Sequence, residues 1–326
     1  AGVLVIPAQA QTEEDPRRLS RDMIAAYEKG DLDRAIEIGQ KLTAIAPADH
    51  DVQYNMACLF ALKGEKEKAI EWLQKSADND FAKLDLVTTD SDLTSIRNEP
   101  GYARAVEKIR AAHERSFEKF KPKAAKSEPV IIVPPGIDET KPAPLIVALH
   151  GRGVTANSMV TVWADVAQEA GAILVAPSAV LNAGRGYDWG EVDEAEWVVM
   201  NALKQVAEQH KIDKERVVLT GFSQGGYMAF NLGVRHPEEF RGVIPVGGAY
   251  NRSIASPSFI KTARKPKFYL MVGADDESAE SNRRAAKDFE AAGVSVQLKV
   301  YEGVAHDFPK ERDAELRKAL EFIWAK

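Results

Sequence analysis

The stretch Val217-Val-Leu-Thr-Gly221-Phe-Ser223-Gln-Gly225-Gly226 decides the fold, because an apolar strand changes there into the start of a helix. The turn between the two has the pattern G-x-S-x-G. A serine at the apex of so sharp a turn leaves no space for a Cβ two residues before it or two after it, so glycine is required at both positions. An ordinary glycine-rich turn is the alternative for the pattern alone. In its strand-turn-helix setting, the motif predicts that Ser223 is a nucleophile.

Short apolar runs alternate with amphipathic stretches on both sides of this motif. The alternation predicts a largely parallel sheet covered by helices on both faces. Strands are expected at 130–133, 145–149, 172–175, 217–220, 243–244, 268–272 and 296–301, and helices at about 157–170, 193–211, 224–235, 281–292 and 312–325. Ligands of such sheets bind beyond the carboxyl ends of the strands, so we expect the chemistry in the loops that follow them.

A serine becomes a strong nucleophile only when a base takes its proton and a carboxylate orients that base. Two histidines follow Ser223 in the chain. His236 lies in Arg-His-Pro-Glu-Glu at the end of the helix after the turn, which predicts a surface position. His306 lies on a loop after the strand at 296–301, so His306 is the expected base. The carboxylate is expected in Gly273-Ala-Asp275-Asp276, where only one of the two adjacent aspartates should reach the imidazole.

Two backbone N–H groups should stabilise the negative charge that develops on the substrate oxygen. The N–H of Gln224, directly after the nucleophile, is one candidate. The other is the N–H of Arg152 in Leu149-His150-Gly151-Arg152-Gly153, where the glycines let the backbone approach a substrate. His150 is expected to order this loop rather than to react. The Arg152 side chain is expected to be solvated or to contact an acidic group of the substrate.

From about Ser127 to Lys326 the chain resembles the α/β-hydrolase superfamily, through LHGRG, GFSQGG, GADD and GVAHDFP. The resemblance is greatest to the small serine-esterase branch that includes phospholipase/carboxylesterases, feruloyl esterases and polyhydroxybutyrate-depolymerase-like enzymes. It implies an α/β-hydrolase fold and hydrolysis of a small or medium carboxylic ester through a Ser-His-Asp triad and an acyl-enzyme, with no cofactor and no metal. In related hydrolases the carboxylate commonly lies three positions beyond a glycine that ends the strand, which favours Asp276 over Asp275.

A glycine-rich loop from Asn182 to Glu191 carries two aromatic residues on the expected side of the sheet. Tyr187 and Trp189 are therefore candidates for a substrate-binding wall, with a loop anchored in the core by Trp189 as the alternative.

Two other functions compete with the esterase. One is a serine peptidase of the same fold, and the other is a repeat-based adaptor with a vestigial hydrolase domain.

The first part of the chain contains an internal repeat. Gly30-Asp-Leu-Asp-Arg-Ala35-Ile36 recurs 34 residues later as Gly64-Glu-Lys-Glu-Lys-Ala69-Ile70, and a further shift reaches Ala103. A helical period of 34 residues is similar to that of tetratricopeptide repeats. The resemblance implies binding of a peptide or protein partner, self-association, or a cap that only packs on the rest of the chain. Cys58 lies among apolar residues and is expected to be buried.

The composition sets the remaining expectations. The 326 residues carry 43 Lys and Arg against 49 Asp and Glu, so the net charge of −6 argues against a nucleic-acid partner. One Cys excludes a disulfide framework, and no apolar run is long enough to span a membrane. The apolar start followed by Ala8-Gln-Ala10 resembles the end of a signal peptide and predicts a secreted or periplasmic protein. A cytoplasmic protein is the alternative.

These patterns divide the chain into four segments. Residues 1–16 form a truncated signal peptide or a disordered tail, and residues 17–120 form the tetratricopeptide-repeat-like helical domain. Residues 121–127, which are rich in lysine and contain a proline, are expected to be a linker. Residues 128–326 form the α/β-hydrolase catalytic domain.

Overall fold

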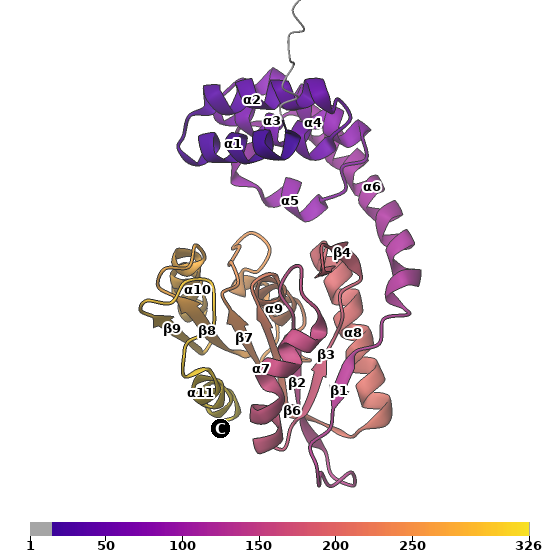
Figure 1. The fold of residues 1–326 in the computed structure, drawn as a ribbon, viewed down its shortest axis with the longest axis vertical. Helices are drawn as coiled ribbons and strands as arrows, with labels where there is room; N and C mark the ends of the chain where they lie inside the picture. The colour runs from indigo at the N-terminus through magenta and orange to yellow at the C-terminus, as the bar shows by residue number, and fades with distance from the viewer. Residues whose placement is uncertain (1–14, 326) are drawn as a thin grey trace, which may run out of the picture. The chain divides into compact units, whose positions relative to one another are not determined.

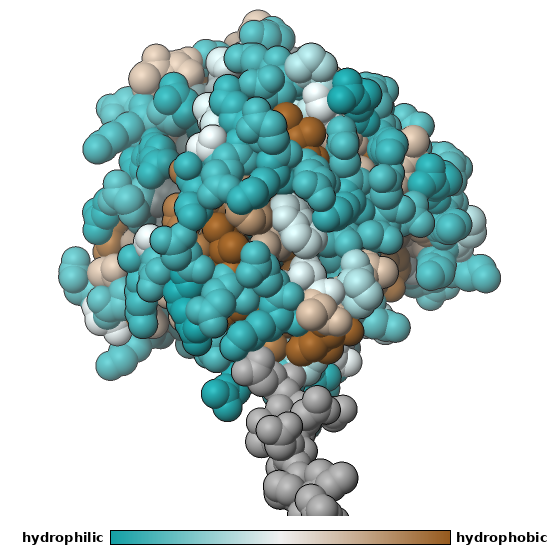
Figure 2. Space-filling model, turned by 90° about the horizontal axis from the view of Figure 1, so that it is seen from above, coloured by the Kyte–Doolittle hydropathy of each residue, from teal (hydrophilic) through white to brown (hydrophobic). Residues whose placement is uncertain are grey.

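A computed structural model describes residues 15–325 of the chain (Figure 1). Residues 1–14, which include most of the signal-like segment, lie outside the described residues. The contacts divide the chain into two compact units that meet between Ser116 and Phe117. No helix among the described residues is long and apolar enough to cross a membrane. On the face shown in Figure 2, hydrophilic residues predominate and hydrophobic ones form small separate patches.

The first unit is all-helical and repeats with the period read from the sequence. Helices α1 (Pro16–Glu28) and α2 (Leu32–Ile45) are followed by α3 (His50–Leu62) and α4 (Lys66–Asp78), so each helix of the second pair begins 34 residues after its counterpart. The turns also match, because Gly30 and Gly64 have φ angles of 74° and 78°. These angles lie in the left-handed region that glycine adopts without strain.

The third repeat departs from the first two. Helix α5 (Leu84–Thr89) and the 3₁₀ helix η1 (Ser91–Ile96) occupy the place of its first helix, and α6 (Pro100–Ala124) is its second. Ala35 and Ala69 are fully buried, whereas the corresponding Ala103 is exposed. Cys58 is buried on α3, as its apolar neighbours predict.

The expected linker at residues 121–127 is wrong. Helix α6 continues to Ala124 in spite of Pro122, and Phe120 and Ala124 are buried in the core of the second unit. Phe120, just before this segment, and Ala124, within it, are four residues apart among lysines, so they share one face of a helix. The second unit therefore begins at Phe117, within α6.

The second unit contains a seven-stranded sheet in the order β1-β3-β2-β6-β7-β8-β9. Only β1 is antiparallel to its neighbour, and the other pairs are parallel. The strands are β1 (Val130–Ile132), β2 (Ala143–Leu149), β3 (Ile173–Ala176), β6 (Ile212–Phe222), β7 (Gly242–Val246), β8 (Lys267–Gly273) and β9 (Val296–Tyr301). This is the mostly parallel sheet that the sequence predicts.

Helices cover both faces of the sheet (Figure 1). Helices α7 (Ala156–Glu169) and α11 (Arg312–Trp324) pack on one face, and α8 (Val192–Gln209), α9 (Gln224–Arg235) and α10 (Ala279–Ala291) pack on the other. Alternate residues of β2 enter the two cores, with Ile146 in one and Val147 in the other. All seven residues of β2 are buried, because neither face of the strand meets water.

Two short elements were not expected from the sequence. Strands β4 (Leu181–Ala183) and β5 (Gly186–Asp188) form a hairpin in the glycine-rich loop after β3. Each strand has three residues, which is too short for a periodic pattern. A short 3₁₀ helix, η2 (Pro257–Phe259), lies between β7 and β8.

Candidate active site

Ser223 occupies the sharp turn between β6 and α9. Its φ angle of 57° is one of two positive values among the described non-glycine residues. A Cβ on Gly221 would lie 2.2 Å from the carbonyl oxygen of Gly225, and a Cβ on Gly225 would lie 2.2 Å from that of Leu149. The backbone geometry therefore excludes side chains at both glycines of the motif, which is the reason the sequence pattern suggested.

His306 lies between Ser223 and a buried carboxylate. Its Nε2 is 2.8 Å from the Ser223 hydroxyl oxygen, and its Nδ1 is 2.8 Å from Oδ2 of Asp276. Asp276 is buried and also accepts the N–H of Ser278 through Oδ1, whereas Asp275 is exposed. The two oxygens of Asp276 thus have separate partners, which fixes the plane of the carboxylate and the orientation of the ring.

Close backbone contacts bring these loops together. A Cβ on Gly273, at the end of β8, would lie 2.1 Å from the carbonyl oxygen of Val304, so the loop that carries His306 packs directly on this strand end. The N–H of Asp275 donates to the same carbonyl at 3.0 Å. Asp275 is exposed and contributes its backbone N–H to the loop, whereas Asp276 is buried and contributes its side chain.

Aromatic rings pack beside the imidazole. The centroid of the Phe222 ring lies 5.0 Å from that of His306 and 5.1 Å from that of Phe308. The His306 side chain remains 44% exposed, so a ligand can reach the face of the site at Ser223. The second downstream histidine, His236, lies at the opposite end of α9 and is half-buried beside Glu196, 3.2 Å away. It takes no part in this arrangement.

The two backbone amides expected to face the developing charge lie on the loop after β2 and at the start of α9, on either side of Ser223. Gly151 approaches so closely that a Cβ there would be 3.4 Å from the Ser223 Cβ. Gln224 is the first residue of α9, so its N–H points out of the helix N-terminus, where the partial positive charge of the helix dipole is concentrated. Within residues 15–325, neither the Arg152 nor the Gln224 N–H donates to a protein acceptor.

His150 is buried and orders its loop, as the sequence suggested. Its Nε2 accepts the N–H of Ala179 at 3.2 Å, and its Nδ1 lies 2.8 Å from the carbonyl oxygen of Gly151, to which it donates. Burial lowers the pKa of His150, so the neutral ring is favoured.

The prediction of Trp189 as a substrate-binding residue is wrong. The side chain is 1% exposed, and its Nε1 donates to the carbonyl oxygen of His150 at 2.8 Å. Trp189 therefore anchors the loop in the core, which is the alternative that the sequence left open. Tyr187 is half-buried against the same core and does not line the cavity beside Ser223.

Asp188, between these two aromatic residues, was missed by sequence reasoning. Its Oδ2 lies 2.7 Å from the Arg152 guanidinium, and its Oδ1 accepts from the Gln224 carboxamide at 2.7 Å. The Arg152 side chain is thus paired with Asp188 while remaining largely exposed. The only signal in the sequence was a carboxylate in a glycine-rich loop, and such a residue is not specific for a functional role.

A cavity of about 290 Å³ opens beside Ser223. It is lined by Gly151, Arg152, Val154, Ser158, Met159, Val162, Phe222, Ser223, His306 and Phe308. Its walls are mainly apolar, with one cation and no carboxylate.

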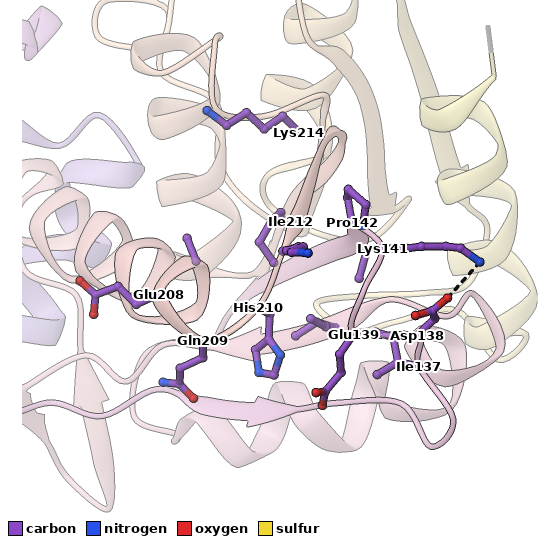
Figure 3. Close-up of a pocket in the computed structure, with 14 residues that line it drawn as sticks. Ile137, Asp138, Glu139, Lys141, Pro142, Glu208, Gln209, His210, Ile212 and Lys214 are labelled. Carbon is purple, nitrogen blue, oxygen red and sulfur yellow. Dashed lines mark ion pairs between the residues drawn. The ribbon is translucent and has the colours of Figure 1, made fainter.

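A larger cavity of about 620 Å³ lies at the starts of β2 and β6, between charged residues such as Lys141 and Asp138 (Figure 3). It is at the opposite end of the parallel strands from Ser223, away from the serine and its histidine.

One group of side chains in the described part of the chain has the composition of a metal site. Ligand atoms of Cys58, Asp90 and Asp92, in the helical unit, lie within 4.8 Å of one another. Burial and nearby carboxylates raise the pKa of the Cys58 thiol, whose Sγ lies 3.5 Å from Oδ2 of Asp90. In this structure the thiol therefore acts as a hydrogen-bond donor to the Asp90 carboxylate.

Residues 132–325 match the sequence profile of the phospholipase/carboxylesterase family. The chain belongs to this family. The match begins at the last residue of β1 and covers the rest of the sheet and all the residues assembled around Ser223. The family therefore accounts for the second unit and not for the helical unit that precedes it.

Curated relatives resemble a smaller part of the chain. A probable feruloyl esterase C of Aspergillus oryzae and the feruloyl esterase C of Emericella nidulans are each 33% identical over 129 residues. Each match covers 37% of this chain and 46% of the relative. A poly(3-hydroxyalkanoate) depolymerase C of Paucimonas lemoignei is 27% identical over 134 residues, which are 38% of this chain and 32% of the relative. The chain thus spans less than half the length of these relatives.

Solved structures share the fold at low sequence identity. Esterase PE8 is 22% identical, with a TM-score of 0.51 over 60% of this chain and 99% of that structure. An uncharacterized protein from Bacillus cereus ATCC 10987 is 16% identical, with a TM-score of 0.52 over 94% of this chain and 98% of that structure. At these identities the likeness extends to the fold alone.

Proposed function

We propose that the chain is a serine hydrolase of carboxylic esters. The observation that carries this proposal is the continuous hydrogen-bonded line from Asp276 through His306 to Ser223, at the mouth of an apolar cavity. Family membership and the feruloyl esterase relatives support the same reaction class. The buried carboxylate, the imidazole and the strained serine have the roles of a catalytic triad.

The reaction follows from the order of these groups. The Ser223 oxygen attacks the ester carbonyl carbon while Nε2 of His306 takes the hydroxyl proton, and the Asp276 carboxylate holds Nδ1–H of the ring and stabilises the imidazolium. The N–H groups of Arg152 and Gln224 stabilise the tetrahedral oxyanion. His306 then protonates the leaving alcohol. Water, activated by the same imidazole, attacks the acyl-enzyme and releases the acid.

The cavity beside Ser223 favours a small or medium acyl group. Its volume of about 290 Å³ is at the lower end of ligand pockets, which commonly measure about 300–1,000 Å³. Val154, Met159 and Val162 provide an apolar wall that suits an aliphatic chain or an aromatic ring. A wall of this kind offers little to recognise the backbone of a peptide, so it favours an ester over an amide substrate.

Labelling by a fluorophosphonate probe, together with turnover of p-nitrophenyl esters, tests the proposal. The expected result is labelling at Ser223, with kcat/KM rising as the acyl chain lengthens and then falling once the cavity is full. Methyl ferulate tests an aromatic acyl group in the same assay. Folded protein that is not labelled at Ser223 would reject the esterase and favour the adaptor. Faster cleavage of peptide amides than of esters would favour the peptidase.

We further propose that α1–α6 are repeats of the tetratricopeptide type. The equal spacing of the first two helix pairs and the matching turns at Gly30 and Gly64 support this proposal. Such repeats present surfaces for peptides or for other copies of a chain. Light scattering of the whole protein and of residues 117–326 tests self-association: a dimer of the whole protein with a monomeric fragment supports it, and two monomers would reject it.

A further inference from the structure

The β4–β5 hairpin is held against the loop that follows β2. The N–H of Gly153 donates to the carbonyl of Tyr187 at 2.9 Å, and the N–H of Tyr187 donates to the carbonyl of Val154 at 3.0 Å. A Cβ on Gly186 would lie 2.4 Å from this backbone, so the approach requires glycine. The hairpin is therefore fixed to the loop that carries Arg152. The second strand of the hairpin, β5, ends at Asp188.

Asp188 connects this loop to the start of α9. Its carboxylate lies 2.7 Å from Nε of Arg152 and accepts the Nε2–H of Gln224 at 2.7 Å and the N–H of Gly190 at 2.7 Å. The Gln224 carboxamide is held at both ends, because its Oε1 also accepts the N–H of Trp189 at 3.2 Å. The side chains of Arg152 and Gln224 thus both bind the end of β5.

Arg152 and Gln224 are also the residues whose backbone N–H groups are proposed to stabilise the oxyanion. Arg152 lies on the loop after β2 and Gln224 at the start of α9, so the distance between them depends on contacts between segments that are far apart in the sequence. Their side chains are joined by one carboxylate that is 19% exposed. An ion pair at the surface adds little stability, whereas fixing two donors relative to each other has a direct effect on a transition state.

We propose that Asp188 is a positioning residue that sets the spacing of the oxyanion-stabilising amides of Arg152 and Gln224. The inference rests on the proposed esterase function and adds a residue to it. Asp188 does not line the cavity beside Ser223. It acts through two side chains, while the Arg152 guanidinium offsets the charge of the carboxylate near the site where the oxyanion develops.

Two substitutions separate the interaction of Asp188 with Arg152 from its interaction with Gln224. Asp188→Asn keeps one oxygen for Gln224 and Gly190 but turns an NH₂ group toward the Arg152 guanidinium, so it releases only Arg152. Asp188→Ala releases both residues. Since removing one oxyanion donor lowers kcat by about 10²–10³-fold, a displaced donor should lower it by about 10-fold in Asp188→Asn and up to about 100-fold in Asp188→Ala. KM should stay within about threefold, because an oxyanion forms only in the transition state.

Asp213→Asn is the matched control. Asp213 binds Nε of Arg216 at 2.7 Å and the N–H of Glu215 at 3.0 Å, but it lies at the other end of β6 from Ser223. This variant should keep the kcat of the wild type. Thermal midpoints of all variants show which proteins are folded, and Asp188→Asn retains the shape of the side chain in case Asp188→Ala does not fold.

Affinity for an aryl trifluoromethyl ketone provides a readout that a merely structural role would not change. The Ser223 oxygen adds to the carbonyl carbon of the ketone, and the serine proton moves to His306. The carbonyl oxygen becomes an oxyanion that accepts hydrogen bonds from the two backbone amides. The affinity should fall by the same factor as kcat/KM in both Asp188 variants. A kcat within twofold of wild type in folded Asp188→Ala, or unchanged ketone affinity, would overturn this inference alone. Wild-type turnover that survives Ser223→Ala would instead reject the proposed function.

Discussion

Oδ2 of Asp276 lies 2.8 Å from Nδ1 of His306, while the adjacent Asp275 contributes only its backbone N–H to the loop that carries the histidine. Two neighbouring carboxylates of the same type thus have different surroundings. Asp276 is buried, accepts a second hydrogen bond from Ser278 and faces the ring, whereas Asp275 is exposed. The difference makes the assignment of the carboxylate testable by a pair of isosteric substitutions.

Asp276→Asn should lower kcat by about 10³–10⁴-fold, because an amide in place of the carboxylate favours the wrong imidazole tautomer. Asp275→Asn is the matched control and should change kcat by less than about threefold, since its exposed side chain has no role in the line of hydrogen bonds. Steady-state turnover of p-nitrophenyl butyrate measures both. The opposite pattern in two folded proteins would assign the carboxylate to Asp275.

Ser223→Ala and His306→Ala should each lower kcat by several orders of magnitude, and the double variant should lose little more. The two residues act as a unit, so removing the second partner has almost no further effect. The thermal midpoint should change little, because neither side chain fills the core. His236→Ala, altered at the far end of α9, should keep turnover within about threefold. A loss in His236→Ala as large as that in His306→Ala would contradict the choice of base.

The sequence predicted the strands and helices of the second unit closely because their signals are local. The apolar run at 217–220, the glycines around Ser223 and the helical spacing after it each depend on a few neighbouring residues. Asp276 and His306 each follow a strand that could be recognised, and the choice of Asp276 over Asp275 rested on the resemblance to related hydrolases. Their location at a common edge followed from the parallel sheet, which places the carboxyl ends of its strands together.

The missed features depend on contacts between segments that are distant in the sequence. Asp188 gains its importance from Arg152 and Gln224, which no local pattern connects to it. Trp189 lies in a loop whose glycines suggest exposure, and only the packing of the loop on His150 shows that it is buried. Phe120 and Ala124 lie among lysines, so their common buried face becomes clear only when the helix is seen against the sheet.

The boundary within α6 predicts how the second unit tolerates truncation. A fragment of residues 117–326 should fold and hydrolyse a small soluble ester within about tenfold of the whole protein, because it contains all the proposed site residues and its own core. A fragment of residues 127–326 lacks Phe120 and Ala124, which are buried in that core. Losing a buried phenylalanine costs about 3–5 kcal/mol, so the shorter fragment should melt at a clearly lower temperature.

Phe120→Ala in the longer fragment is the control for this comparison, because it removes the same buried ring without shortening the chain. Its thermal midpoint should fall most of the way toward that of the shorter fragment. Two fragments with equal midpoints would show that the end of α6 does not stabilise the second unit. A fragment of residues 117–326 that is folded but inactive would show that the helical unit completes the site.

The buried His150 should make the protein less stable in mild acid. Burial lowers its pKa in the folded state below the ordinary value of about 6.5, which the unfolded chain retains. Its contribution to the free energy of unfolding is therefore fully present above that value and is lost as the pH falls below it, because the unfolded state then binds a proton that the folded state does not.

His150→Gln cannot titrate, and its amide oxygen can still accept the N–H of Ala179. The variant should be less stable than wild type at pH 7.5, but its thermal midpoint should fall less between pH 7.5 and pH 5.5. Parallel curves for the two folded proteins would show that His150 takes up its proton equally well in both states.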